Sequence, residues 1–160
     1  MPEEKMKPIF LLAMALPLLI TPLAHATPPT TATGTFTASF TVLTGTTAGG
    51  NTIITVNETA TLTGSLVGTR IAQGSEIIHP DGSFVAMDTG TFTGTVNGVP
   101  GTLVITGHST GTGATGAGSF VVNQATGAST DMHGFGPFEF SATGPTSTTG
   151  TYSITLHTNA

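Results

Sequence analysis

Apolar and polar residues alternate along most of this chain, and threonine is the commonest polar member of the alternation. Between Thr35 and Val42, the apolar residues Phe36, Ala38 and Phe40 share one parity with Val42, while threonine and serine occupy the other. A period of two sends alternate side chains to opposite faces of a β-strand. No segment after residue 26 sustains the spacing of about 3.6 residues that an amphipathic helix requires. The pattern therefore predicts an all-β fold.

Turn residues separate the alternating segments. Gly49-Gly50-Asn51, His79-Pro80-Asp81-Gly82 and Asn97-Gly98 are typical of tight turns between strands. Short connections favour antiparallel neighbours, so we expect a closed antiparallel up-and-down barrel, with a two-sheet β-sandwich as the alternative. The pattern predicts about eight strands, at residues 33–43, 51–66, 68–79, 83–97, 101–110, 117–124, 135–142 and 147–157.

The N-terminal segment has the three parts of a secretory signal. Lys5 and Lys7 precede an apolar run, residues 9–20, which is followed by Ala24-His25-Ala26. The run is shorter than the roughly 20 residues that span a bilayer as a helix, although an uncleaved anchor is the alternative. We expect a signal peptide at 1–26, a mobile lead-in at 27–32 and one barrel domain at 33–160. Cleavage after Ala26 would make the protein secreted or periplasmic.

Charge is scarce in the predicted domain. Arg70 is the only basic residue after Ala26, and the chain contains no cysteine. Nucleic-acid binding requires clustered cations, so we expect no nucleic-acid partner. We also expect no stable membrane insertion after cleavage, because the chain lacks tryptophan and has a single tyrosine, whereas an outer-membrane pore carries aromatic girdles. The acidic residues of the domain are Glu58, Glu76, Asp81, Asp88, Asp131 and Glu139.

Two of these carboxylates share the parity of apolar neighbours. Glu58 is in phase with Val56, and Asp88 is in phase with Phe84 and Phe92. Burial of an ionised carboxylate is costly, so such a group protonates or finds a partner. We therefore predict that Glu58 and Asp88 orient a ligand or act in acid–base chemistry. The alternatives are a bulge that reverses the parity, a position at the barrel mouth, or a salt bridge with Arg70.

Several segments resemble a family of small uncharacterised bacterial proteins whose barrel is similar to that of plant allene oxide cyclase. The segments are residues 59–69, 80–85 and 92–105, together with Met132-His133-Gly134-Phe135. The likeness extends over residues 33–157 and rests mainly on turns and core positions. It implies the same barrel fold, and it leaves a cyclase or isomerase activity as an alternative function.

Other motifs carry weaker signals. Gly107-His108-Ser109-Thr110-Gly111 matches the nucleophile-elbow pattern, which works only at a sharp turn from a strand into a helix. A minor alternative is a metal site with ligands drawn from His79, Asp81, His108, Asp131 and His133. We expect no metal and no cofactor.

These observations favour a non-enzymatic exported barrel that binds a small hydrophobic or amphipathic molecule in its interior. A cyclase-like enzyme and a fully packed structural or surface module are the alternatives. The predicted ligand-binding residues are Glu58, Asp88, Phe36, Phe40, Val56, Phe84, Phe92 and Tyr152.

Overall fold

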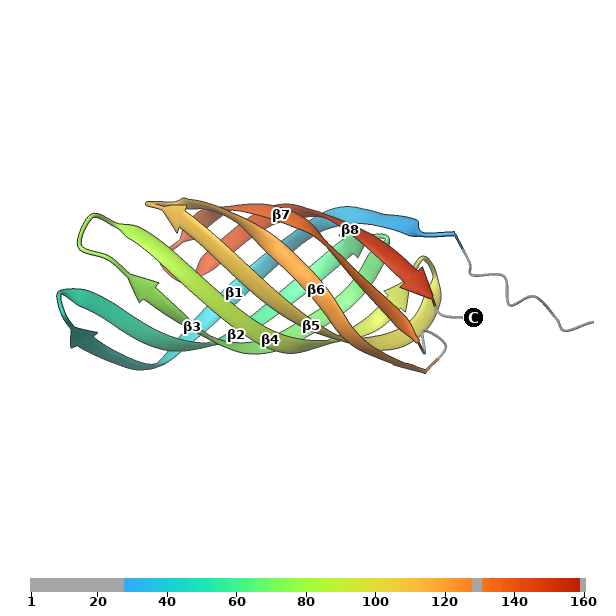
Figure 1. Ribbon diagram of the computed structural model, residues 1–160, viewed down its shortest axis with the longest axis horizontal. Helices are drawn as coiled ribbons and strands as arrows, with labels where there is room; N and C mark the ends of the chain where they lie inside the picture. The colour runs from blue at the N-terminus through green and yellow to red at the C-terminus, as the bar shows by residue number, and fades with distance from the viewer. Residues whose placement is uncertain (1–27, 128–130, 159–160) are drawn as a thin grey trace, which may run out of the picture.

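Eight antiparallel strands form a closed ring in the computed structural model, which describes residues 28–127 and 131–158 (Figure 1). Each strand pairs with the next one in the sequence, and β1 pairs with β8 from Thr30↔Leu156 to Ser39↔Ser147. This last pairing closes the sheet, so the barrel prediction is confirmed and the sandwich alternative is wrong. The strands are β1 (Thr30–Ala48), β2 (Asn51–Gly64), β3 (Leu66–Ile78), β4 (Ser83–Val96), β5 (Val99–Thr112), β6 (Thr115–Gly127), β7 (Met132–Gly144) and β8 (Ser147–Thr158).

The first strand is longer at both ends than the sequence predicted. It begins at Thr30, inside the segment expected to be a mobile lead-in, because residues 30–32 pair with β8 and Ala32 is fully buried. It continues to Ala48 because the β1–β2 hairpin turns only at Gly49 and Gly50, both of which have positive φ. The predicted signal peptide lies outside the described residues.

Side chains inside the barrel divide it along its axis into a packed end and a hollow end. The packed end contains the chain termini of the described barrel and the β2–β3 and β4–β5 turns. Its core includes Leu66, Phe92, Val96 and Leu103, none of them more than 2% exposed. At the opposite end lie the connections β1–β2, β3–β4, β5–β6 and β7–β8, where Val42 on the inner face is 53% exposed.

Three β-bulges interrupt the ladder without disturbing the strands that carry Glu58 and Asp88. They lie beside Leu43 in β1, Asn123 in β6 and Thr143 in β7. A bulge adds one residue and changes the parity beyond it. Accordingly, Phe120 and Val122 precede the β6 bulge and Ala125 follows it, and all three are buried.

Among residues 28–127 and 131–158 there is no helix with the length and hydropathy to cross a bilayer.

Candidate functional site

Arg70 lies at the boundary between the packed and hollow parts of the barrel. Even-numbered residues of β3 face inward, and this parity carries Arg70 into the interior, where it is 2% exposed. Its cross-strand partners are Ala60 on β2 and Phe92 on β4, both buried. The long side chain therefore has to reach along the barrel interior to find polar partners.

Two carboxylates from the neighbouring strands contact the guanidinium group. Arg70 Nη1 donates to Glu58 Oε1 at 2.7 Å, and Nη2 donates to Asp88 Oδ1. Nη2 also donates to the carbonyl of Ile105 at 3.1 Å, and the guanidinium lies 5.6 Å from the ring centroid of Phe120. The three ionisable groups come from β2, β3 and β4, so their contacts join three adjacent strands.

The ion group is not completely satisfied by the described residues. Arg70 Nε is buried and has no hydrogen-bond partner among them. Burial raises the pKa of Glu58 above its ordinary value; the Arg70 cation opposes the rise, and nearby Asp88 adds to it. A raised pKa makes a carboxyl group a better proton carrier than an ordinary glutamate, which is a property that a general acid or base uses.

Above this ion group lies a cavity of about 270 Å³. Its wall is mostly apolar and aromatic, and Glu58, Arg70, Glu76 and Asp88 supply its charged groups. The aromatic side chains include a stacked pair, Phe120 and Phe138, with ring centroids 4.2 Å apart. The cavity reaches the end of the barrel at the β5–β6 and β7–β8 turns. The aromatic residues in the wall are Phe36, Phe40, Phe84, Phe120, Phe138 and Phe140.

Glycines on β5 and β6 make room for the side chains of this site. A Cβ atom at Gly107 would lie 2.8 Å from Asp88 Oδ2, and one at Gly111 would lie 2.5 Å from the Phe84 ring. At Gly116, a Cβ atom would lie 2.4 Å from the Phe140 ring. Each of these glycines is paired with that residue on the adjacent strand, so the absence of a Cβ atom leaves interior space for the partner's side chain.

The structure places six of the eight sequence-predicted ligand residues in the cavity wall: Phe36, Phe40, Val56, Glu58, Phe84 and Asp88. Phe92 and Tyr152, also expected in the wall, are instead buried in the packed end. The hydroxyl of Tyr152 accepts a hydrogen bond from Leu66 N at 2.9 Å and donates to Thr63 O at 2.9 Å. Alternation identified the face on which these two residues lie, but not their depth in the barrel.

Two charged residues of the cavity wall, Arg70 and Glu76, were not among the predicted ligand-binding residues. The sequence pattern predicted Arg70 only as a possible salt-bridge partner and gave no role to Glu76. Glu76 lines the cavity, and burial raises its pKa above its ordinary value. Both residues share the parity of the buried Leu66 and Ala72, so the signal was present in the sequence of β3.

The nucleophile-elbow pattern does not form the turn that its chemistry requires. Ser109 lines the cavity, but it lies within β5, which continues to Thr112. His108 is exposed on the opposite face.

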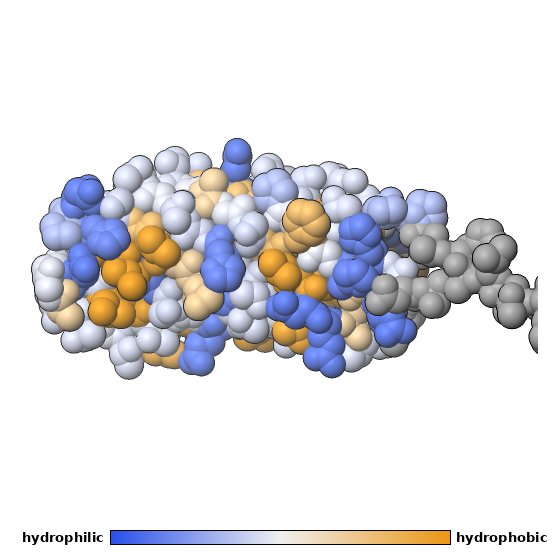
Figure 2. Space-filling view, viewed as in Figure 1, coloured by the Kyte–Doolittle hydropathy of each residue, from blue (hydrophilic) through white to orange (hydrophobic). Residues whose placement is uncertain are grey.

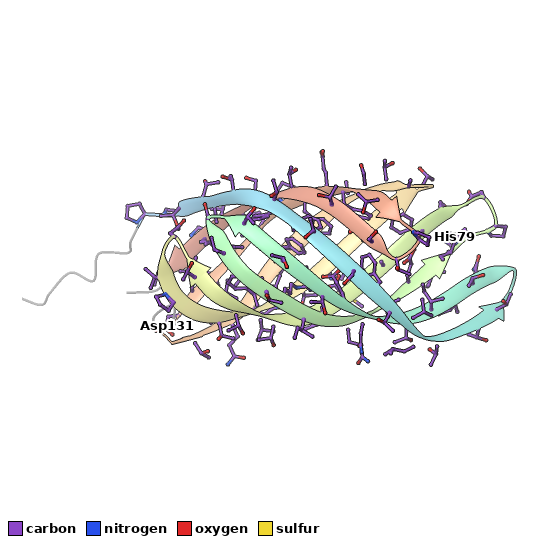
Figure 3. All side chains as sticks on the ribbon, turned by 180° about the vertical axis from the view of Figure 1, so that it is seen from behind. His79 and Asp131 are labelled. Carbon is purple, nitrogen blue, oxygen red and sulfur yellow. The ribbon has the colours of Figure 1, made fainter. Side chains whose placement is uncertain are left out.

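The metal alternative also fails geometrically, because His79 and Asp131 lie at opposite ends of the barrel (Figure 3). Within the described ranges, no group of three or more histidine, aspartate and glutamate residues could hold a metal ion.

The outer face of the barrel is mixed in character. Figure 2 shows small apolar patches separated by hydrophilic residues on the face in view. The most exposed large apolar side chains are Ile71 and Phe135, each 64% exposed. Glu139 is exposed on the outer face. The aromatic cavity is thus an interior feature that the outer face does not share.

Comparisons with known proteins support the fold. No protein-family model matches the sequence, and no curated protein matches it. A protein of unknown function from the DUF3224 family of Shewanella oneidensis MR-1 has a similar structure, with a TM-score of 0.69 and 17% identity over 83% of this chain and 99% of the other.

Two pterocarpan synthase dirigent proteins also have similar structures. GePTS1 has a TM-score of 0.53 and 14% identity, over 83% of this chain and 92% of its own. PsPTS1 has a TM-score of 0.56 and 16% identity, over 84% of this chain and 98% of its own. At these identities the likeness establishes a shared β-barrel fold. None of the three is described as an allene oxide cyclase, so that part of the resemblance stays a prediction.

Replacement of Arg70 tests the role of the ion group in stability. Arg70→Met should lower the free energy of unfolding by about 3–5 kcal/mol at neutral pH, because it leaves two partly buried carboxylates without their counter-ion. The triple variant Arg70→Met/Glu58→Gln/Asp88→Asn should recover most of this loss, since no uncompensated charge remains. Chemical denaturation measures both values. An Arg70→Met variant as stable as the wild type would contradict the stabilising role of the ion group.

Glu76 gives a prediction for pH dependence. Its folded-state pKa is raised above the ordinary value of 4.5, so the folded state favours the neutral carboxyl. The stability contributed by neutral Glu76 is present below pH 4.5 and is lost as the pH rises through the raised pKa. Glu76→Gln should therefore gain stability relative to the wild type over this interval. Chemical denaturation at a series of pH values measures the free energy of unfolding of Glu76→Gln relative to the wild type, with Glu139→Gln as the exposed control. A loss of stability in Glu76→Gln over this interval would contradict the prediction.

Proposed function

We propose that this protein is an exported barrel that binds a small apolar or amphipathic molecule in its hollow end. The observation that carries the proposal is the aromatic cavity of about 270 Å³ above a buried ion group. Ligand sites in proteins are typically apolar concavities with a few placed polar groups.

The polar groups are placed to orient a ligand. Glu58, Arg70 and Asp88 form one side of the cavity floor, whereas aromatic rings form much of the wall. The unpartnered Arg70 Nε–H is a donor for an acceptor atom, and buried donors normally find one in protein, ligand or water. An amphipathic ligand would place its apolar body against the rings and its polar end beside the charged side chains of the wall.

Export is supported by the sequence pattern of residues 1–26, with its basic start, short apolar run and Ala24-His25-Ala26. A secreted or periplasmic binding barrel would meet small amphipathic molecules outside the cytoplasm. The mass of the protein purified from its native cells would test cleavage after Ala26. The full uncleaved mass would contradict this part of the proposal.

Indole is a suitable probe of the cavity because the chain contains no tryptophan, so indole can be excited at wavelengths that the single tyrosine does not absorb, without protein background. We expect saturable binding with a blue-shifted emission, as the ring leaves water for an apolar site. Native mass spectrometry of the purified protein would in addition detect a retained natural ligand. An empty protein that also fails to bind indole would favour the packed structural module.

A cavity-filling variant locates the binding. Ala86→Phe adds a ring on the inner face of β4, and should weaken indole binding at least tenfold by occupying the cavity. Thr89→Phe adds the same ring on the exposed outer face of β4 and is the matched control. Fluorescence titration compares them, with circular dichroism to verify the fold. Equal binding by the two variants would place the indole elsewhere.

A cyclase- or isomerase-like activity is the second candidate, favoured by Glu58. This carboxyl lines the cavity and has a raised pKa, so it could donate a proton to a bound ligand. The similar barrels of two proteins named as pterocarpan synthases are consistent with chemistry in such a cavity.

Glu58→Gln separates the two candidates. An enzyme should lose turnover of the ligand recovered from the native protein, with a fall in kcat of about 100-fold or more, while binding of that ligand is retained. Product formation by mass spectrometry and binding by calorimetry give the two readouts. No product from the wild-type protein would leave binding alone as the function.

A further inference from the structure

Carboxyl groups outnumber cations in the cavity. Of the charged side chains in its wall, Glu58, Glu76 and Asp88 are acidic, and Arg70 alone is basic. They come from β2, β3 and β4, and the other five strands contribute no ionisable side chain to the wall. Arg70 is already shared between Glu58 and Asp88. The cavity therefore contains more potential negative charge than its own cation can balance.

Glu76 is the carboxyl group without a counter-ion. It forms no ion pair or hydrogen bond with another described side chain, and it lies nearer to the barrel mouth than Arg70. Its cross-strand partner on β4 is Ala86, so Phe84 and Asp88 are its two diagonal neighbours on the inner face, each roughly 7 Å away. One ligand group could therefore contact Glu76, Asp88 and the Phe84 ring together.

Aromatic rings complete this part of the wall. The Phe84 ring lies 6.1 Å from the Phe140 ring between centroids, and Phe140 lies at the same distance, 6.1 Å, from Phe138. Deeper in the barrel, the Arg70 guanidinium already lies over the Phe120 ring. Ring faces attract cations, and aromatic surroundings are a common means of recognising organic ammonium groups. Aromatic rings beside a free carboxyl group suit a cation better than an anion.

We propose that the polar group of the ligand is an organic ammonium, bound between Glu76, Asp88 and Phe84, with its apolar body against the deeper phenylalanines. This inference rests on the proposed binding function and adds the charge of the ligand to it. A ligand carboxylate would add a further negative group beside Glu58, Glu76 and Asp88. A ligand oxygen or a water molecule near the floor would satisfy the remaining Arg70 Nε–H.

Matched indole derivatives test the charge. Tryptamine, tryptophol and indolepropionate share the ring and a short chain that ends in an ammonium, a hydroxyl or a carboxylate. The affinities are measured by fluorescence titration at neutral pH in about 0.1 M salt, because salt at this concentration screens the attraction of cationic ligands to the net acidic surface. We expect tryptamine to bind at least tenfold more tightly than tryptophol, and indolepropionate to bind most weakly.

Glu76→Gln removes the free carboxyl group and leaves the Arg70 contacts in place, and Glu139→Gln removes one exposed carboxyl group from the outer face. The first variant should reduce the tryptamine preference about tenfold, whereas the second should retain it. Circular dichroism verifies that both variants are folded.

Each outcome has a distinct meaning. Equal binding of the three derivatives, or tightest binding of indolepropionate, would overturn the ammonium proposal and leave the binding function intact. A tryptamine preference that survives in Glu76→Gln, or that falls equally in Glu139→Gln, would also overturn it. Failure of indole and all three derivatives to bind would contradict the binding function and, with it, the inference.

Discussion

The buried ion group of Glu58, Arg70 and Asp88 is the constraint on which the interior of this barrel depends. A guanidinium group stays ionised under all ordinary conditions, so its burial is tolerable only where carboxylates and carbonyls surround it. Here those partners come from β2, β4 and β5. The contacts therefore require four strands to keep their register, because a slip of one residue would turn the charged side chains to the outer face.

The position of Arg70 also explains why the barrel has two different halves. Toward the termini, aliphatic and aromatic side chains such as Leu66 and Phe92 fill the interior. Toward the other end, the ion group replaces part of this apolar core, and small residues such as Gly74 and Ala86 line the wall. Charged groups cannot be covered by apolar packing without loss of their partners or of water. The hollow end is the structural consequence of burying charge at mid-barrel.

Alternation in the sequence predicted the strands, the closed barrel and the inward direction of Glu58 and Asp88, because parity is a local property of an extended chain. Depth along the axis is different, since it depends on how neighbouring strands are staggered around the ring. For this reason Tyr152 and Phe92 were assigned to the cavity although they lie in the packed end. The alternation in β3 also places Glu76 and Arg70 on the inward face. Charged residues are seldom buried, however, so their residue type alone favours an exposed position.

The excess of acidic groups in the cavity follows from the scarcity of basic residues. Among the described residues Arg70 is the only lysine or arginine, and it already has two carboxylate partners, so no second such cation is available there for Glu76. The described protein can lower the cost of burying Glu76 by protonating it, which is the direction of its raised pKa. A bound ammonium group would lower the same cost by supplying the missing charge. Ligand and proton therefore compete to neutralise one carboxyl group, which links occupancy of the cavity to its ionisation.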